Sequence, residues 1–179
     1  MKAAIFILGT VALGIGLWGS LSPPSCPPAR TDDTQAALIA SYLVEGTRTH
    51  FSADGSASDV LIIGTATRWD NNDETELRNI HYQAQAEDGT AWDIDASAGI
   101  FFENSNELAL KNGVTVIERN GEAAMTTEAM RLYMDENRAE GQHEVVMTGR
   151  GSRTTGSAFE LDLGTNRATL IGNVSTEYE

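Results

Sequence analysis

Apolar and polar residues alternate with a period of two along most of this chain. Ile80, Tyr82 and Ala84, for example, are separated by His81 and Gln83. An apolar residue at every second position gives a strand one buried and one solvated face. The pattern therefore predicts half-buried antiparallel strands within residues 61–69, 80–84, 92–97, 108–111, 114–116, 130–134, 145–147, 159–163 and 168–178.

Turn-forming residues separate these segments, as in Asp54-Gly55, Glu87-Asp88-Gly89 and Asn120-Gly121. Such residues favour the tight turns of hairpins. No helical pattern lies between the predicted strands, and only residues 36–42 suggest a short helical turn before the first of them. The chain is therefore predicted to fold as an all-β sandwich or barrel.

Two of the predicted strands carry a similar interruption. Residues 110–114 read Leu-Lys-Asn-Gly-Val and residues 170–174 read Leu-Ile-Gly-Asn-Val. Glycine inside a strand often marks a bend or bulge. Repeated bends of this kind predict strands that follow a curved or rolled sheet.

The N-terminus carries an uncharged apolar run over residues 3–22. Twenty helical residues rise about 30 Å, which matches the hydrocarbon core of a bilayer. We therefore expect residues 1–22 to form a transmembrane anchor, with Lys2 keeping the N-terminus cytoplasmic and the rest of the chain exported. A cleaved signal, disfavoured by Pro23, and a lipoprotein acylated at Cys26 remain as alternatives.

A proline-rich linker over residues 23–36 follows the anchor, and residues 37–179 form the predicted β domain. Prolines hold a linker near extended polyproline geometry. Within the anchor, glycines at 9, 14, 16 and 19 have two interpretations. Either glycine is simply frequent in membrane helices, or these small residues let the helix pack against another membrane protein.

The chain is strongly acidic, with a formal net charge of −14. This balance argues against binding to nucleic acid or adsorption to an anionic lipid surface, because both require basic patches. Cys26 is the only cysteine, which rules out an internal disulfide. The exported domain must therefore be held together by its hydrophobic core.

No catalytic or metal-binding constellation emerges from the sequence. His50, His81 and His143 lack partners at zinc-site spacing. The glycine-rich segment 149–156 lacks the ending of a phosphate loop and is predicted to be a hairpin loop. Asp93 and Asp95 share a strand face, which we interpret as solvated. The residues themselves therefore predict no catalytic, cofactor-binding or metal-binding site.

The apolar interior remains the candidate functional feature, as either a filled core or a cavity for an apolar ligand. It is rich in aromatic residues and in flexible methionines, which adapt to irregular ligands. The residues on which this interpretation rests are Trp69, Tyr82, Trp92, Phe101, Phe102, Phe159, Met130, Met134 and Met147.

Several segments, taken in order after a single N-terminal anchor, resemble the family of the lipopolysaccharide export protein LptC. They are WDIDASAG at 92–99, LALKNGVTV at 108–116, MTTEAMRLYMD at 125–135, TGSAFELDL at 155–163 and LIGNV at 170–174. The resemblance covers nearly the whole chain. Two departures are the Phe-Phe-Glu-Asn at 101–104, where the family has a variable turn, and the acidity of the domain.

The resemblance implies a V-shaped, antiparallel β-jellyroll in the periplasm, anchored to the bacterial inner membrane by a single-pass helix. It implies a protein that is not an enzyme. Such a protein accepts lipopolysaccharide from an inner-membrane ABC transporter into its interior and passes it to the bridge protein LptA. The interior residues expected to contact lipid are Trp69, Tyr82, Trp92, Ile94, Phe102, Leu110, Val116, Leu132, Val145, Met147, Phe159 and Leu161.

The resemblance also implies partners at the open edges of the sheet. The first strand, near residues 42–51, and the membrane helix would join the transporter subunits LptF and LptG. The last strand, residues 168–178, would join LptA. The residues assigned to these contacts are Gly55, Gly156, Leu170, Val174 and Tyr178.

Two other classes of protein remain open. One is a membrane-tethered, carbohydrate-binding or hydrolytic β-roll, for which Asp93 and Asp95 beside Trp92 are the one hint. The other is a secretion-system scaffold with a dry core.

Overall fold

A computed structural model describes residues 38–52, 55–70, 73–86, 89–119 and 123–178. They belong to one compact unit, Ala37–Glu179. The predicted anchor at 1–22 and linker at 23–36 lie outside the described residues. Among the helices of the described part, none has the length and apolarity needed to cross a membrane.

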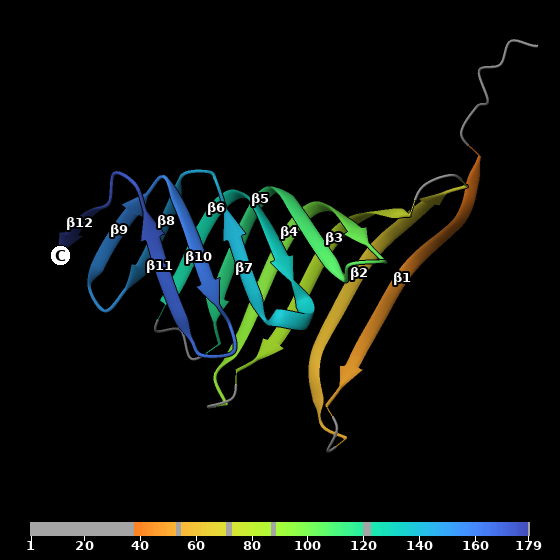
Figure 1. The fold of residues 1–179 in the computed structure, drawn as a ribbon, viewed down its shortest axis with the longest axis horizontal. Coiled ribbons are helices and arrows are strands. Elements are labelled where there is room, and N and C mark those ends of the chain that lie inside the picture. The colour runs from red at the N-terminus through yellow and green to blue at the C-terminus, as the bar shows by residue number, and fades with distance from the viewer. Residues whose placement is uncertain (1–37, 53–54, 71–72, 87–88, 120–122, 179) are drawn as a thin grey trace, which may run out of the picture. The chain divides into compact units, whose positions relative to one another are not determined.

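The described residues form one antiparallel sheet with a single short 3-10 turn, η1 (Met134–Glu136) (Figure 1). The prediction of an all-β fold is confirmed, and the open sheet is consistent with a jellyroll. Its strands are β1 (Ile39–Phe51), β2 (Ala57–Trp69), β3 (Glu74–Gln85), β4 (Ala91–Phe102), β5 (Glu107–Glu118), β6 (Ala123–Tyr133), β7 (Arg138–Gly141), β8 (Val145–Gly149), β9 (Ser152–Gly156), β10 (Ala158–Asp162), β11 (Arg167–Ile171) and β12 (Ser175–Tyr178).

The six strands after β6 behave as interrupted long strands. Both β7 and β8 pair with β6, at its two ends. Next along the chain, β9 pairs with β8 and β10 pairs with β7. Finally β11 pairs with β10 and β12 pairs with β9. The sheet is therefore a simple meander in which each of the last long strands is broken once.

These breaks line up with bends in the earlier strands, and we call the resulting line the crease. Several of its residues have positive φ, a conformation that asparagine and glycine adopt most readily. Their φ values are 54° at Glu45, 52° at Asn79, 67° at Asn112, 82° at Gly113, 67° at Gly172 and 47° at Asn173. The pairing places on the same line Gly64, Ser97, Glu128, residues 142–144 and Ser157. The bends predicted at Gly113 and Gly172 are thus confirmed.

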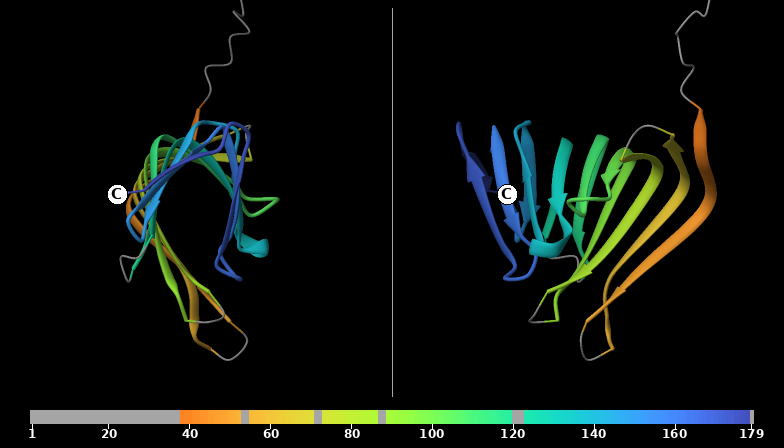
Figure 2. Two further views of the ribbon diagram at one scale, coloured as in Figure 1. Left: turned by 90° about the vertical axis from the view of Figure 1, so that its left-hand side faces the viewer. Right: turned by 45° about the vertical axis from the view of Figure 1, so that its right-hand side comes forward.

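The sheet folds at the crease into two walls that face each other (Figure 2, left). The β11 wall holds residues 39–44, 65–69, 74–78, 98–102, 107–111 and 129–133, with β7, β10 and β11. The β12 wall holds residues 46–51, 57–63, 80–85, 91–96, 114–118 and 123–127, with β8, β9 and β12. Hairpin loops form the free rim of each wall, opposite the crease.

The hydrophobic core lies between the two walls. The β12 wall contributes Tyr82, Ile94 and Val116, and the β11 wall contributes Leu132 and Phe159. Each of these side chains is no more than 1% exposed. The alternation read from the sequence therefore gives the correct buried residues in these strands.

The helical turn expected at residues 36–42 is wrong for the part that is described. Ile39 begins β1, and Tyr42 pairs with Thr67 of β2. The neighbouring strand satisfies the backbone groups along this segment, and isoleucine and tyrosine suit a strand better than a helix. Tertiary pairing outweighs the weak local preference for a turn.

Two further expectations near the C-terminus are corrected. Residues 168–178 do not form one strand, because Gly172 and Asn173 both adopt positive φ and separate β11 from β12. The glycine-rich segment 149–156 is a hairpin, but its loop is only Arg150-Gly151 between β8 and β9. The remaining residues of that segment form β9.

Candidate functional site

The interior between the walls is the candidate site, and it collects ten of the twelve side chains expected there. Nine of them belong to the buried core: Tyr82, Trp92, Ile94, Leu110, Val116, Leu132, Val145, Phe159 and Leu161. Met147 is half-buried and pairs with the buried Met125. Together they form a continuous apolar interior that runs from β3 to β10.

Phe102 and Trp69 are placed on the outer face instead. Phe102 lies under the guanidinium of Arg131, 5.4 Å from its ring centroid, and Arg131 lies between the inward-facing Met130 and Leu132. It is Phe101 that packs against the core. The reason is the crease, because an irregularity of one residue in a strand reverses which side chains face inward. In β4 this reversal occurs near Ser97, between Ala96 and Ala98.

Trp69 is affected in the same way by the bend at Gly64. Before the bend, Leu61 and Ile63 of β2 face the core, whereas after it Ala66 does. The alternation after the bend puts Trp69 on the outer face. The sequence signal that marks this reversal is Gly64 itself, a glycine inside an otherwise β-branched strand.

A cavity of about 320 Å³ opens at the end of the interior where β8 and β9 lie. Met147 and Thr154 line it from the β12 wall, and Asn166 lines it from a rim loop of the β11 wall. The hydroxyl of Thr154 lies 3.1 Å from that of Thr176 in β12. Tyr178, two residues further along β12, is 84% exposed.

The opposite end of the sheet is the open edge of β1. This strand pairs only with β2, and Gly46 is its only buried residue. Unpaired backbone groups on an edge strand can template the addition of another strand. The exposed apolar side chains along this edge are Ile39, Tyr42, Leu43, Val44, Phe51 and, on β2, Ile62.

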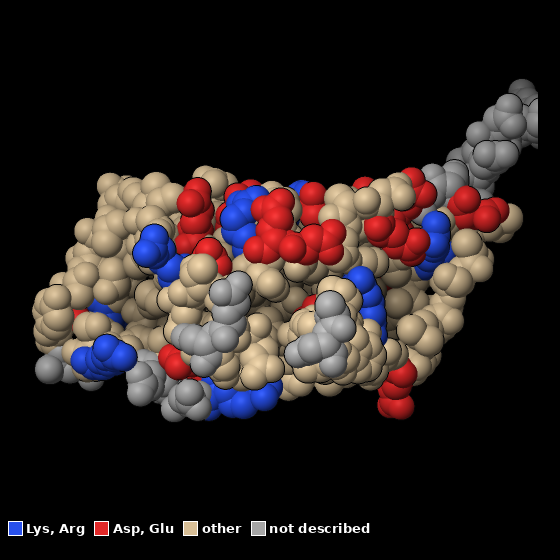
Figure 3. Space-filling model, turned by 60° about the horizontal axis from the view of Figure 1, so that its bottom comes forward, with Lys and Arg blue, Asp and Glu red and all other residues tan. Residues whose placement is uncertain are grey.

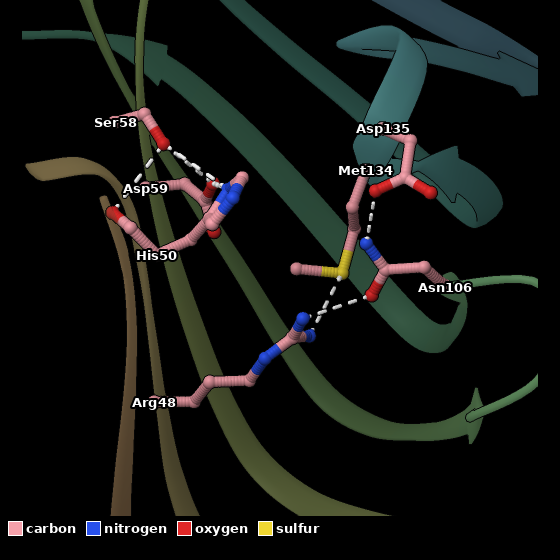
Figure 4. Close-up of polar contacts among 7 residues, drawn as sticks. All are labelled: Arg48, His50, Ser58, Asp59, Asn106, Met134 and Asp135. Atoms are coloured by element: carbon pink, nitrogen blue, oxygen red, sulfur yellow. Dashed lines mark hydrogen bonds and ion pairs between the residues drawn. The ribbon is translucent and has the colours of Figure 1, made fainter. Parts of the chain in front are cut away.

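At this β1 end, Arg48 reaches from the β12 wall to the β11 wall (Figure 4). Its Nη2 donates a hydrogen bond to Oδ1 of Asn106 at 3.0 Å, and its Nη1 lies 3.8 Å from Sδ of Met134. The guanidinium also stacks over Phe101, 5.2 Å from the ring centroid. Arg48 therefore bridges the two walls at the mouth of the interior.

Next to Arg48, a serine, a histidine and an aspartate form a cluster. Nδ1 of His50 lies 3.0 Å from Oδ2 of Asp59 and 3.3 Å from Oγ of Ser58. A nucleophilic triad needs the base to meet its two partners through different ring nitrogens. Here both partners meet the same nitrogen, so the arrangement stabilises the buried Asp59 carboxylate and does not activate Ser58.

Two polar atoms inside the walls have no hydrogen-bond partner among the described residues: the Tyr82 hydroxyl and the Trp92 indole nitrogen. Burial, and then the nearby Asp59 carboxylate, raise the pKa of Tyr82, while Arg48 opposes them. The hydroxyl therefore stays protonated and can donate. Buried donors without partners are uncommon and point to groups that a ligand would satisfy.

The carboxylates of Asp93 and Asp95 lie on the outer face, away from Trp92, as the alternation predicts. Arg119 Nη2 lies 2.8 Å from Asp93 Oδ1, and His81 Nδ1 lies 2.8 Å from Asp95 Oδ1. The Arg119 hydrogen bond is the main reason why the pKa of Asp93 is below its usual range. The two carboxylates do not converge with Trp92 on a groove, which removes the one hint of a sugar site.

The outer surface is acidic and carries no candidate metal centre. Carboxylates gather along one side of the face that Figure 3 turns forward. Several are paired with arginines, such as Glu107 with Arg131 and Glu140 with Arg138. Among the described residues, no three metal-ligating side chains come together.

The residues assigned to partners fall into three settings. Gly55 has a φ of 85° in the exposed β1–β2 turn. Gly156 is buried at the end of β9, where a Cβ would stand 3.3 Å from the Cβ of Leu170. Leu170 itself packs against the core, whereas Val174 and Tyr178 are exposed near the C-terminal edge.

Comparison with protein families gives one match. The family model described as "Lipopolysaccharide-assembly, LptC-related" matches residues 4–179, which include the whole described domain. No curated protein matches the sequence significantly. The match confirms the family to which the sequence motifs point.

Proposed function

Because the chain belongs to the LptC-related family of lipopolysaccharide-assembly proteins, we propose that its interior carries lipopolysaccharide between an inner-membrane ABC transporter and the bridge protein LptA. Membership of this family implies a role in lipopolysaccharide transport, and the family is not one of enzymes. The observation that carries the finer proposal is the apolar interior between two walls that are continuous only at the crease.

The energetics of lipid transfer favour such an interior. Each methylene group exposed to water costs about 0.8 kcal/mol, so a chain of 12 carbons costs roughly 10 kcal/mol. A lipid with several chains therefore needs a continuous apolar path across the periplasm. Leucine, valine, isoleucine and phenylalanine side chains of both walls supply one.

Loading requires the walls to separate, because the interior is packed. The cavity of about 320 Å³ beside Met147 is at the small end of ligand pockets, which span about 300–1,000 Å³. Several acyl chains need more room than this. The walls would part at their loop rims, with the crease as the hinge, since glycine and asparagine there already hold the positive φ of the bend.

Partner binding would occur at the two open ends of the sheet. The exposed apolar strand β1, together with the N-terminal membrane helix, would join LptF and LptG in the inner membrane. At the other end, β11 and β12 each pair with a single neighbour and would join LptA. The domain would then lie in the periplasm, with the N-terminus in the cytoplasm.

Photocrosslinking from neighbouring positions tests the proposal. A photoreactive residue at Met147, on the inner face of β8, should crosslink to lipopolysaccharide in cells that export it. The same residue at Thr126, exposed on the outer face of the neighbouring strand β6, should not. Met147→Asp or Trp92→Asp should abolish lipid transfer through the interior. Equal crosslinking from Met147 and Thr126 would contradict transport between the walls.

The C-terminal contact has its own test. A chain that lacks residues 170–179 should remain anchored and should no longer capture LptA. Retention of LptA by the truncated chain would refute the assignment of this edge.

A further inference from the structure

Arg48 differs from four other arginines of the domain in the groups that it contacts. Arg68, Arg119, Arg131 and Arg138 each meet a carboxylate. Within the described part of the chain, Arg48 meets only neutral groups: the amide oxygen of Asn106, the thioether of Met134 and the ring of Phe101. No carboxylate of the described residues forms an ion pair with the Arg48 guanidinium, so its positive charge is available to an anionic ligand.

Arg48 lies at the entrance to the apolar interior. Its strand partner Leu61 is buried in the core, so Arg48 lies on the inner face of β1, at the mouth between the walls. Two carboxylates at this end of the sheet have other partners. Asp59 is held by His50 and Ser58, and Asp135 accepts a hydrogen bond from the amide nitrogen of Asn106. Figure 4 shows Arg48 pointing to Asn106 and Met134, apart from the cluster around Asp59.

A second, independent observation comes from Tyr82. This side chain is fully buried, and its hydroxyl has no partner among the described residues. Tyr82 pairs with Leu61 of β2, and Leu61 pairs with Arg48 of β1, so the two side chains lie on the inner face in one row across adjacent strands. A guanidinium that contacts only neutral groups and a hydroxyl without a partner among the described residues thus lie near one mouth of an apolar interior.

We propose that Arg48, supported by the Tyr82 hydroxyl, forms a subsite for the phosphate groups of an anionic lipid whose acyl chains lie between the walls. This inference rests on the proposed function and names the headgroup chemistry that it requires. The planar guanidinium matches a phosphate with two parallel hydrogen bonds. Such bonds are stronger than the one that Arg48 gives to the neutral Asn106 amide, so the exchange is favourable.

The inference also explains how an acidic protein holds an anionic lipid. The outer surface repels phosphate, since the net charge is −14. The guanidinium at the β1 end therefore attracts the headgroup at a place where the acyl chains can also enter the interior. Arg48 would select phosphorylated lipids, while the apolar walls bind the chains of either kind.

The test compares two lipids and two variants of the full-length chain in neutral detergent. Binding of hexa-acylated, bisphosphorylated lipid A is measured beside that of the same lipid after removal of its phosphates. Arg48→Gln should weaken binding of the phosphorylated lipid about tenfold, which corresponds to about 1.4 kcal/mol, and should leave the dephosphorylated lipid unchanged. Arg48→Lys should bind the phosphorylated lipid with an affinity between those of the wild type and Arg48→Gln. Lysine keeps the positive charge but cannot form the two parallel hydrogen bonds of the guanidinium.

Arg78→Gln is the matched control. It removes the same charge from an exposed position on the outer face of β3 and should affect neither lipid. Thermal unfolding of each variant separates loss of binding from loss of folding. Equal weakening of both lipids by Arg48→Gln, or no weakening, would overturn the phosphate subsite while leaving lipid transport intact.

Inorganic phosphate distinguishes the source of the anion. It should bind the wild-type chain at least a hundredfold more weakly than the phosphorylated lipid does. Binding of free phosphate as strong as that of the lipid would overturn the assignment to a lipid headgroup. If the wild-type chain binds neither lipid, the proposed function itself fails, and the subsite fails with it.

Discussion

Gly64 and Asn79 face each other across β2 and β3, so closely that a Cβ on Gly64 would stand 2.9 Å from the Cβ of Asn79. Their neighbours Thr65 and Arg78 are paired in the register, which puts both residues on the crease. Asn79 has a φ of 52°, so the bend and the close approach occur at the same place. The walls fold over a contact that leaves no room for a side chain at residue 64.

Gly64→Ala should therefore destabilise the domain by about 1–3 kcal/mol, the usual cost of forcing atoms into a packed site. Urea unfolding measures the loss. Gly164→Ala is the control, because a Cβ there would meet Asp162 at 3.4 Å and Asn137 at 3.7 Å, which are ordinary contact distances. That variant should be neutral or slightly more stable, since alanine restricts the unfolded chain. Similar losses in both variants would mean that the crease has no special tightness at Gly64.

Substitution of a second glycine of the crease should destabilise the domain for a different reason. Gly113 has a φ of 82°, and nothing lies within 4 Å of where its Cβ would be. Gly113→Ala should therefore cost about 1 kcal/mol through backbone strain alone. Asn112→Gly, at the neighbouring φ of 67°, should be tolerated. Thermal unfolding of the two variants checks the assignment, which is contradicted if Asn112→Gly proves the more damaging.

The sequence predicted which residues alternate, but not on which side of each bend the alternation reverses. The buried series Ile80, Tyr82 and Ala84 follows from the period-two pattern alone, because no bend interrupts it. Gly113 and Gly172 correctly predicted two bends, and the sequence motifs correctly predicted the family. The crease as a whole was not visible, since Glu45 and Ser97 have no special signature in the sequence.

The wrong predictions for Phe102 and Trp69 follow from the unpredicted reversal of the alternation at the crease. Counting in steps of two from Trp92 puts Phe102 inside, yet the shift near Ser97 exchanges it for Phe101. The register that decides the matter comes from pairing with β3 and β5, which no local pattern encodes. The bridge from Arg48 to Asn106 likewise joins residues 58 positions apart and depends on the closed walls.

The exposed edge strand gives a third prediction, which concerns partners. Tyr42 and Val44 of β1 are 60% and 56% exposed, so a Tyr42→Lys, Val44→Lys double variant should fold normally. Lysine on an edge strand opposes the addition of another strand. Co-purification of LptF and LptG with the full-length variant should therefore fall at least fivefold.

The control for the edge variant is Thr126→Lys, which adds a lysine to an exposed position on β6, away from any edge. It should leave co-purification unchanged. If the double variant retains the transporter subunits as well as Thr126→Lys does, β1 is not the docking edge.

The ion pair between Asp93 and Arg119 predicts a specific dependence of stability on pH. The Arg119 hydrogen bond lowers the pKa of Asp93, with further help from Gln83 and His81 and against the effect of burial. A carboxylate whose pKa is lower in the folded state stabilises the fold above its unfolded pKa of about 3.9. That contribution disappears as the pH falls through the lower, folded value.

Asp93→Asn should therefore reduce the free energy of unfolding at pH about 7, and the difference from wild type should shrink as the pH falls below about 4. Urea unfolding at low ionic strength over this range measures it, and added salt should reduce the effect because Arg119 is half exposed. Asp70→Asn, at an exposed position in the β2–β3 turn, should show no such trend. A difference at Asp93 that persists unchanged in acid would mean that the carboxylate acts through packing and not through its charge.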